Sequence, residues 1–483
     1  MNIFDRMIAT VAPGAALERV RARRALDVLA HYDAASTGRR SKSWRPEGTD
    51  ADAAAGRRER LAYVSRDMIR NTPFASRAQQ VIANNVVGDG IIPKVKGPTK
   101  GLERQALSLI EQHFDTTAID ADGRANLYGL QRLAMNTIVE SGEVLIRRRI
   151  RTPGEGLPLP FQIQILEADY LDTRWDGIAA NGNLIKEGIE YDLIGRRIAY
   201  YLFDEHPGSA TFRNFAPRSG SRRISASEIL HVYRQDRPGQ MRGVSWFAPI
   251  ALNLQDLGDH QDAQLMRQKI AACFAAFRVT PDAIPDESQS AISRKLQPGA
   301  IVDLGPGEDI RFGSPPKVDG FDEFTKVVLR SVAAGMGITY EALSSDLSNV
   351  NFSSGRMGRM EMDRNVSSWQ WLMMVPQFLQ PFSGWFKDAW AALGDDRVLS
   401  ARIEWVPPHR ILVDPNREIT ALRDKVRAGF ASRQGVIREL GFDPERLLEE
   451  IKEDHKAAAD AGLKFDSDAA HDASQQVETP TDE

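Results

Sequence analysis

The chain has 483 residues, 42% of them hydrophobic, which is enough to bury a large core spread over roughly two to four domains. Its formal net charge of −4 excludes the strongly basic composition of most proteins that hold nucleic acid tightly. No apolar run reaches about 18 residues, and the N-terminal apolar patch contains Asp5 and Arg6. We therefore expect no membrane span, no secretory signal and a cytoplasmic location. The single cysteine, Cys273, excludes an internal disulfide and a thiolate zinc cluster.

The two ends of the chain differ in charge. Residues 1–60 contain twelve Lys and Arg against eight Asp and Glu. They include a helical stretch at 15–31 and a Gly-, Ser- and Arg-rich stretch at 35–44. We predict an N-terminal arm over residues 1–55, which either reaches a neighbouring molecule or is an ordinary floppy terminus. The last segment, 466–483, has six acids and no Lys or Arg, which predicts a disordered acidic tail.

Helical and strand patterns then alternate along the chain. Residues 56–87 predict two helices separated at Asn71 and Pro73, and residues 127–141 predict an amphipathic helix. Alternation in 143–150 predicts a strand, and shorter strand-like runs follow between turn residues at 161–166, 188–191, 197–203 and 229–233. The middle of the chain is therefore expected to be α+β, with largely antiparallel pairing.

The hydrophobic period next becomes that of one long helix. Residues 246–276 would span about 46 Å at about 1.5 Å per residue. Residues 278–320 are punctuated by Pro and Gly, which predicts a small β-rich insertion, and residues 321–336 return to helix. A polar stretch at 344–355 precedes an apolar and aromatic segment at 357–393. The predicted fold ends with a strand at 398–405 and charged helices at 415–430, 432–440 and 444–463.

The sequence lacks the residues of a recognisable reaction centre. Gly243-Val244-Ser245 begins like a nucleophile elbow, but Phe247 replaces the glycine that permits the tight turn. Gly305-Pro306-Gly307-Glu308 lacks the Gly-Lys-Ser/Thr that completes a phosphate-binding loop. The eight histidines are scattered and never share a helix face. We predict no catalytic residue, no cofactor and no metal, which indicates a structural protein.

Three further groups of polar residues favour ordinary structure over a binding site. Glu228 and His231 would point to opposite faces of a strand. Asp120 and Asp122 lack the full ligand pattern of a calcium loop, so we predict a turn. Arg147-Arg148-Arg149 either contacts phosphates or forms a solvated strand edge, and we favour the edge because alternation turns the middle arginine to the other face.

One block of the sequence is especially specific: Tyr340-Glu341, then Leu343 to Ser348, then Asn351 to Arg356. It resembles one known family, the lambda-type portal proteins of tailed phages, and the resemblance extends over most of the chain. Phe352 stands where that family more often has Tyr, and Gly355 where it more often has Ala. Many relatives also carry a tryptophan near residues 120–123 that this chain lacks. Shorter similar blocks are Tyr32 to Ala35, Ser141 to Val144, Gly243 to Ser245 with Pro249, Leu304 to Ile310, Trp405 to Pro407, Asp414-Pro415 and Gly429 to Gly441.

The resemblance implies an α+β portal fold in a dodecameric ring, through which double-stranded DNA enters and leaves a capsid at one vertex. It implies four kinds of partner besides DNA: further copies of the chain, the terminase large subunit, the major capsid protein, and head-completion or tail connector proteins. Carried onto this sequence, it predicts a wing (56–245 and 360–414), stem helices (246–276 and 321–338), a clip (277–320), a tunnel-loop region (339–359) and a crown (415–465).

The resemblance also suggests which residues face the DNA. A conduit must not hold a polyanion tightly, because each neutralised phosphate adds affinity. Asp256, Asp259 and Asp262 share about one third of a helix circumference, and line the channel or form a solvated outer face. Arg356 and Arg359 would supply a modest cationic ring or salt bridges between subunits. The neutral tunnel-loop candidates are Ser348, Asn349, Asn351, Ser353 and Ser354, and the terminase-facing clip candidates are Arg294 and Lys295.

The aromatic side chains could pack within the assembly or stack on bases, and the chain could have other functions. Duplex DNA hides its bases, so we expect the aromatic side chains to pack between the wing and neighbouring subunits rather than to stack on bases. The sequence does not separate an infectious phage from a gene transfer agent or a defective prophage. An enzyme of unrecognised type, acting through His231 or Ser245, and a generic interaction scaffold are the alternatives from other classes. The aromatic residues are Phe352, Trp369, Trp371, Phe378, Phe382, Trp385, Phe386 and Trp390.

Overall fold

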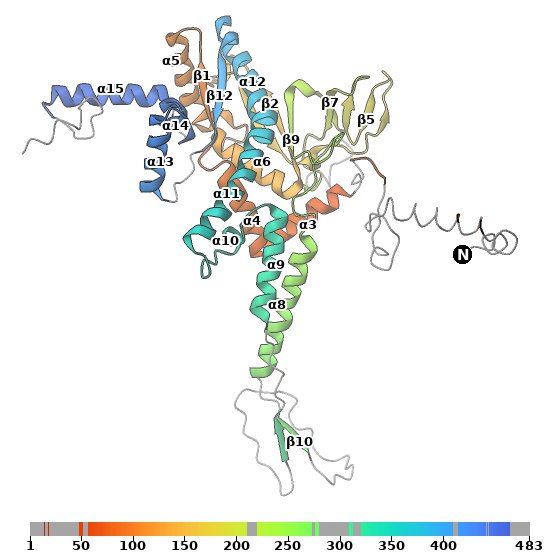
Figure 1. Ribbon diagram of the computed structural model, residues 1–483. Coiled ribbons are helices and arrows are strands. Elements are labelled where there is room, and N and C mark those ends of the chain that lie inside the picture. The colour runs from red at the N-terminus through yellow and green to blue at the C-terminus, as the bar shows by residue number, and fades with distance from the viewer. Residues whose placement is uncertain are drawn as a thin grey trace, which may run out of the picture. The chain divides into compact units, whose positions relative to one another are not determined.

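The computed structural model describes most of the chain from residue 48 to residue 463. The chain divides into two compact units, Met1–Ala53 and Ala54–Glu483, and the helices and strands named below belong to the second (Figure 1). Most of the predicted arm, the predicted acidic tail, Cys273, Arg294 and Lys295 lie outside the described residues. The described residues are 48–51, 57–209, 220–272, 276–279, 309–312, 320–408, 414–440, 442 and 444–463, with two isolated positions, Gly14 and Glu18.

Three helices from the first part of this unit pack against one another. Helices α3 (Arg58–Asn71) and α4 (Pro73–Val86) are separated by the extended residue Thr72, as the sequence predicted. A residue before proline avoids the helical region, and proline fits the first position of a helix, so Thr72-Pro73 ends one helix and begins the next. Helix α6 (Leu127–Ser141) packs against both. The chain between α4 and α6 includes β1 (Ile92–Lys96) and α5 (Lys100–Leu109).

The strands pair antiparallel, which confirms the α+β prediction. A three-stranded sheet has β2 (Glu143–Ile150) between β3 (Phe161–Leu166) and β9 (Ile229–Tyr233). Strand β1 pairs with β12 (Arg402–Val406). A five-stranded sheet is built in chain order from β4 (Gly177–Ile178), β5 (Leu184–Lys186), β6 (Ile189–Tyr191), β7 (Arg197–Leu202) and β8 (Arg222–Ser225).

The predicted strand edge at Arg147-Arg148-Arg149 is correct only in part: β2 is the central strand of its sheet, but β9 pairs with it only as far as Arg147, and Arg148 and Arg149 pair with β3 alone. The Arg148 guanidinium lies 5.9 Å from the Phe161 ring centre and 6.0 Å from that of Trp385, on the face opposite its two neighbours. Arg149 donates to Gln164 at 2.6 Å. Burial lowers the pKa of Arg147 and of Arg149. These arginines are half-buried, and their side chains pack against the fold.

Two long helices lie side by side and lead to a hairpin (Figure 1). They are α8 (Ala251–Ala272) and α9 (Phe321–Met336), and the hairpin pairs β10 (Ala276–Val279) with β11 (Asp309–Phe312). The predicted helix over 246–276 was too long at both ends. Trp246 and Phe247 are 1% and 0% exposed in the turn before α8, and a strand already begins at residue 276. The 22 residues of α8 span about 33 Å.

A long helical course follows α9 and supplies the aromatic core. It consists of α10 (Tyr340–Ser344), α11 (Phe352–Trp369), the π-helix η8 (Gln370–Leu379) and α12 (Gln380–Ala391). Six of the predicted aromatic residues are buried here and pack within this chain, so packing against neighbouring subunits is not their main role. They are Trp369, Phe378, Phe382, Trp385, Phe386 and Trp390, whereas Phe352 and Trp371 are half exposed.

The C-terminal part differs from the prediction at one strand. Val398 lies in a 3₁₀ turn (Asp396–Ser400) capped by the Asp395 side chain, and β12 begins only at Arg402. The three charged helices are confirmed as α13 (Pro415–Arg427), α14 (Arg433–Glu439) and α15 (Pro444–Asp460). Within the described ranges, every helix is too short or too polar to cross a bilayer.

Candidate functional site

The paired helices α8 and α9 meet through a narrow apolar seam. Leu254 and Leu257 on α8 and Val332 on α9 are at most 2% exposed. A Cβ atom at Gly335 would lie 2.3 Å from a methyl carbon of Ile250, so this glycine allows the close approach of the chain before α8 to α9. The seam fixes which face of each helix remains open.

The three aspartates predicted for the channel lie on the open face of α8. Asp256, Asp259 and Asp262 are exposed, and Asp259 accepts a hydrogen bond from Gln255 at 3.0 Å. Each belongs to a helix whose partner α9 covers the opposite side, so these carboxylates are available to solvent or to a neighbouring molecule.

The polar loop after α10 is organised around one carboxylate. Asp346 accepts hydrogen bonds from the Tyr340 hydroxyl at 3.1 Å, from the Ser348 hydroxyl at 2.5 Å and from the Ser348 backbone N–H at 3.1 Å. The hydrogen bonds from Ser348 hold the pKa of Asp346 below its ordinary value. Ser345 adopts a left-handed φ of 58° at the start of this turn. Ser348 therefore stabilises the conformation of the loop.

The first turn of α11 uses two more of the predicted loop residues as a cap. Asn351 accepts from the Ser354 backbone N–H at 2.8 Å, and Ser354 accepts from the Asn351 backbone N–H at 3.2 Å. This reciprocal pair satisfies donors that a helix N-terminus leaves unpaired. Asn349 and Ser353 are exposed, and their side chains make no hydrogen bond within the described residues. The structure thus separates the loop candidates into residues that build it and residues that it presents.

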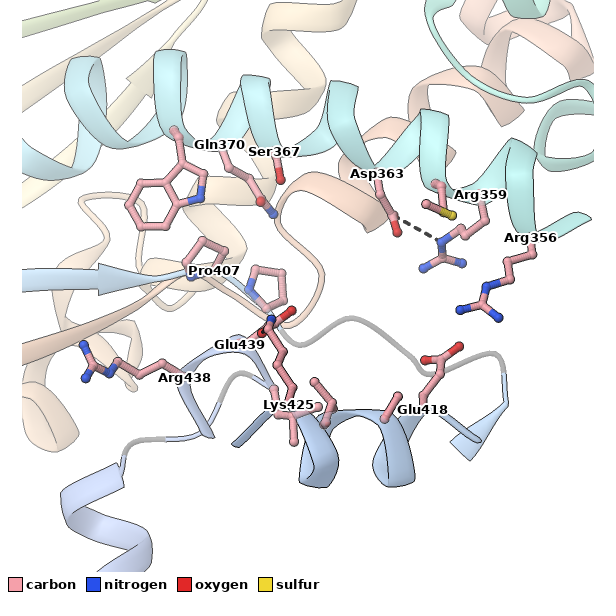
Figure 2. A pocket seen from close by; sticks show the side chains of 16 residues that line it. Arg356, Arg359, Asp363, Ser367, Gln370, Pro407, Glu418, Lys425, Arg438 and Glu439 are labelled. Carbon is pink, nitrogen blue, oxygen red and sulfur yellow. Dashed lines mark hydrogen bonds and ion pairs between the residues drawn. The ribbon is translucent and has the colours of Figure 1, made fainter. Parts of the chain in front are cut away.

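The two predicted arginines border a groove between α11 and the C-terminal helices (Figure 2). Arg359 pairs with Asp363 at 3.2 Å, whereas the exposed Arg356 makes no ion pair within the described part of the chain. The groove has a volume of about 650 Å³. Its opposite wall adds cations that the sequence reading missed, Lys425 and Arg438, together with Glu418 and Glu439. The only sequence signal for Lys425 and Arg438 was that both lie in predicted charged helices.

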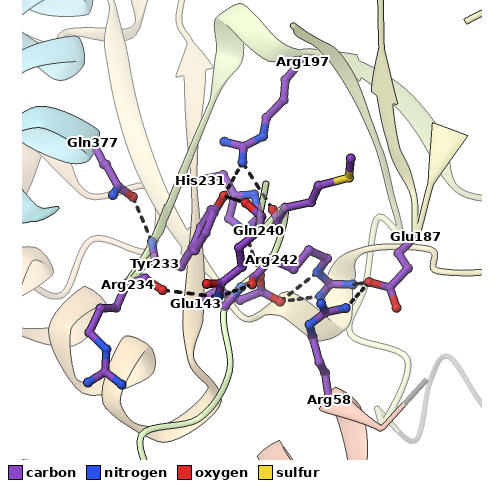
Figure 3. Close-up of polar contacts among 12 residues, drawn as sticks. Arg58, Glu143, Glu187, Arg197, His231, Tyr233, Arg234, Gln240, Arg242 and Gln377 are labelled. Atoms are coloured by element: carbon purple, nitrogen blue, oxygen red, sulfur yellow. Dashed lines mark hydrogen bonds and ion pairs between the residues drawn. The ribbon is translucent and has the colours of Figure 1, made fainter. Parts of the chain in front are cut away.

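A buried ionic network that the sequence reading also missed lies at the start of β2 (Figure 3). Glu143 accepts from His231 Nε2 at 2.8 Å, from Arg242 Nε at 3.0 Å and from the Gly243 backbone N–H at 2.9 Å. Burial alone would raise the pKa of Glu143, but the Arg242 guanidinium and His231 hold it well below its usual range. Burial lowers the pKa of His231. Glu187 extends the network by pairing with both Arg58 and Arg242.

Two glycines make this network possible. Gly142 has a φ of 93°, and a Cβ atom there would lie 2.3 Å from the Val244 carbonyl carbon. A Cβ atom on Gly243 would lie 2.2 Å from the Gly142 carbonyl oxygen. The two backbones are therefore in direct contact, which only glycine at both positions allows. A sequence signal existed, since each glycine lies in a block that resembles the portal family.

The other polar residues examined in the sequence have structural partners. Ser245 shares a 2.6 Å hydrogen bond with Ser65 and accepts from the Phe247 backbone N–H, so it lacks a catalytic base. Asp120 accepts backbone hydrogen bonds from residues 122, 124 and 125, which confirms the predicted turn. Glu228 lies in a 3₁₀ turn that ends just before β9, so the prediction that it shares a strand with His231 is wrong.

One trio with metal-ligand atoms close together exists among the described residues: Glu167, Asp169 and His206. The Arg66 guanidinium already binds both carboxylates of this trio, at 2.5 Å from Asp169 and 3.3 Å from Glu167. A third carboxylate, Glu140, pairs with Arg66 at 2.9 Å. Arg66 thus binds three carboxylates, and His206 Nε2 lies 3.1 Å from Glu167, so the arrangement is an ion-pair cluster.

These features define a structural protein: a mixed α+β body from which a helix pair extends, with a presented polar loop and charged residues engaged in holding the fold. The sequence model of the phage portal protein, lambda family, matches residues 37–370. The chain belongs to the lambda family of phage portal proteins, whose role is structural rather than catalytic. The family match and the observed α+β architecture agree with the expected portal fold.

Curated relatives are similar over nearly the whole chain. A probable portal protein of Halomonas phage phiHAP-1 is 27% identical, over 86% of this chain and 84% of its own length. The portal protein of Escherichia phage N15 is 21% identical, over 90% and 91%. Portal protein B of Escherichia phage lambda is 20% identical, over 90% of each chain.

Solved structures give a weaker similarity. A chain from the neck of a native gene transfer agent particle, computed with C12 symmetry, is 14% identical with a TM-score of 0.47, over 79% of this chain and 94% of that one. An HK97-family phage portal protein from Corynebacterium diphtheriae is 9% identical with a TM-score of 0.33, over 72% and 94%.

Proposed function

We propose that copies of this chain close into a dodecameric ring at one vertex of a capsid, around a channel through which double-stranded DNA is packaged and later ejected. Family membership supports this role. The observation that carries it for this chain is the polar loop presented beside the end of the helix pair. Asn365 on α11 donates to the Gly337 carbonyl at the end of α9 at 2.9 Å, which fixes the loop relative to those helices.

The segments of the chain take distinct places in this proposal. Residues 56–245 and 360–414 form the wing, 246–276 and 321–338 the stem, and 277–320 the clip. Residues 339–359 form the tunnel-loop region and 415–465 the crown. The helix pair with a terminal hairpin, α8–β10–β11–α9, supports the assignment of stem and clip. The clip would contact the terminase large subunit, with Arg294 and Lys295 as candidate contacts. The ring would also contact the major capsid protein and then the head-completion or tail connector proteins.

The chemistry of the presented residues suits sliding. Asn349 and Ser353 offer neutral hydrogen-bonding groups, which touch phosphates without releasing many counterions. Asp256, Asp259 and Asp262, repeated around the ring, would form an anionic belt that repels DNA. Arg356, exposed and without an ion pair in the described region, is the strongest candidate for a DNA contact among the tunnel-loop residues.

Arg356→Ala tests this assignment, and Arg364→Ala is the matched control. Arg364 lies on the same helix, is exposed, and pairs with Glu361 at 3.2 Å. We expect Arg356→Ala rings to assemble normally while packaging less DNA per particle, and Arg364→Ala particles to package like wild type. Normal packaging by Arg356→Ala would remove this residue from the DNA path. Deleting residues 349–354 should likewise reduce DNA retention more than ring formation.

A further inference from the structure

A cavity of about 510 Å³ lies among β7, β9 and the π-helix η8, and it shares no residue with the groove at α11. Its polar lining includes Arg197, Tyr200, His231, Gln240 and Gln377, and no aspartate or glutamate lines it. The groove at α11, in contrast, contains three acids. A cavity with an arginine and no carboxylate is electrostatically suited to an anion.

Arg197 carries the positive charge of this cavity (Figure 3). Its Nη2 donates to the Tyr233 hydroxyl at 2.5 Å and to the Met241 carbonyl at 3.3 Å, and both acceptors are uncharged. Within the described chain, no carboxylate forms an ion pair with Arg197, although its side chain is partly buried. Arg242 nearby has two carboxylate partners, Glu143 and Glu187. Because desolvated arginines ordinarily pair with anions, Arg197 retains an unmet preference for one.

Neutral groups around Arg197 have hydrogen-bonding capacity left over. Tyr200 is 2% exposed, and its hydroxyl makes no hydrogen bond within the described residues. Gln377 accepts from the Tyr233 backbone N–H at 3.0 Å through Oε1, so its amide NH₂ group remains as a donor. The Tyr200 hydroxyl and the Gln377 NH₂ group can therefore both donate to a molecule in the cavity. His231 supplies no donor, because its Nε2–H is donated to Glu143 and its Nδ1 is then an acceptor.

We propose that this cavity binds a small oxyanion, a phosphate or a carboxylate group of a small molecule, with Arg197 as the charged donor and Tyr200 and Gln377 as neutral donors. Both kinds of group present oxygen atoms that a guanidinium binds through two parallel hydrogen bonds. The bound anion would link β7 and β9 to η8. The site is separate from the proposed channel, so it holds whether or not the ring assignment does.

Calorimetric titration of the purified full chain with sodium phosphate, and separately with sodium acetate, at constant ionic strength tests the proposal. Arg197→Gln removes the charged donor. Arg196→Gln is the matched control, because Arg196 is exposed and pairs with Asp192 at 3.2 Å. We expect wild type and Arg196→Gln to bind at least one of the two anions, and Arg197→Gln to bind it about tenfold or more weakly. Binding of phosphate would identify the ligand group as a phosphate, and binding of acetate would identify it as a carboxylate. Equal binding by Arg197→Gln, or binding of neither anion by wild type, would overturn the proposal.

Gln377→Glu keeps the test decisive if Arg197→Gln fails to fold. The glutamate retains an oxygen that can accept from the Tyr233 backbone N–H, and it replaces the NH₂ donor with an anionic oxygen facing the cavity. We expect a folded protein with a native circular dichroism spectrum that no longer binds the anion. A folded Gln377→Glu variant that binds phosphate or acetate as wild type does would contradict the assignment.

Discussion

The carboxylate of Glu143, the first residue of β2, accepts a 2.9 Å hydrogen bond from the backbone N–H of Gly243, which lies 100 residues further along the chain. Two sequence blocks that resemble the portal family separately, Ser141 to Val144 and Gly243 to Ser245, are thus one contact in space. This contact ties the three-stranded sheet to the segment that enters α8. We infer that it sets the direction in which the helix pair leaves the body.

Glu143→Gln should destabilise the protein strongly. The amide preserves shape but leaves the Arg242 guanidinium buried beside a neutral group, and breaking a buried ion pair costs about 3–5 kcal/mol. Denaturant unfolding followed by circular dichroism measures the change, with Glu453→Gln on the exposed face of α15 as the control. If both variants unfold at the wild-type midpoint, the network does not hold the fold.

Gly142→Ala should also destabilise, through the backbone. Its φ of 93° is unfavourable for alanine, and the added Cβ atom would lie 2.3 Å from the Val244 carbonyl carbon. We expect a loss above about 2 kcal/mol. Gly384→Ala is the control, because a Cβ atom there meets nothing within 4 Å and alanine favours a helix. A Gly142→Ala variant as stable as Gly384→Ala would show that the backbones can separate freely.

Stability should fall on mild acidification because of His113. This residue packs 5.3 Å from the Phe161 ring centre, and burial lowers its pKa to about 4. The folded state therefore resists a proton that the unfolded chain takes up below about pH 6.5. The contribution is complete above that pH and is lost as the pH falls towards about 4, amounting to about 3 kcal/mol.

The His113→Phe variant isolates this effect. Phenylalanine fits an aromatic pocket and cannot titrate, so the difference in unfolding free energy between wild type and variant should change with pH over that window. His455→Phe, at an exposed position on α15, is the control and should leave the pH profile unchanged. A constant difference between wild type and His113→Phe from pH 7 to pH 4 would contradict the prediction.

Asn349 and Asn351 should behave differently although both lie in the predicted loop. Asn351→Ala removes the cap of α11 and should cost about 1 kcal/mol in unfolding free energy. The Asn349 side chain has no hydrogen-bond partner among the described residues. Asn349→Ala should therefore leave the stability unchanged, while DNA retention by assembled particles falls. Thermal unfolding and a DNA-retention assay on the same preparations separate the two roles. Unchanged stability in Asn351→Ala would show that the cap is dispensable.

Local patterns predicted much of this fold. Residues 127–141 and 321–336 were expected as helices and match α6 and α9. The amphipathic period that predicts a helix and the glycines that mark its ends are both local features of the sequence. The two-helix break at Pro73 follows from the same local chemistry. The strand at 398–405 was misplaced, since the Asp395 cap converts its first residues into a turn, which β-propensity does not reveal.

Long-range pairing was not predictable in this way. The burial of Glu143 depends on His231, which reaches it because β9 pairs beside β2, and on Arg242, which lies in the segment after β9. The roles of Asn351 and Ser354 as a cap, and of Ser348 as a partner of Asp346, likewise depend on loop geometry. The resemblance located the loop, whereas the structure distinguished the residues that shape it from those it presents.

Electron microscopy of the purified full chain tests the central claim most directly. The account predicts closed rings with an axial opening wide enough for a double helix, with the helix pair α8 and α9 pointing along the axis. A protein that stays monomeric at high concentration and under capsid-assembly conditions, or that closes without an axial opening, would contradict it.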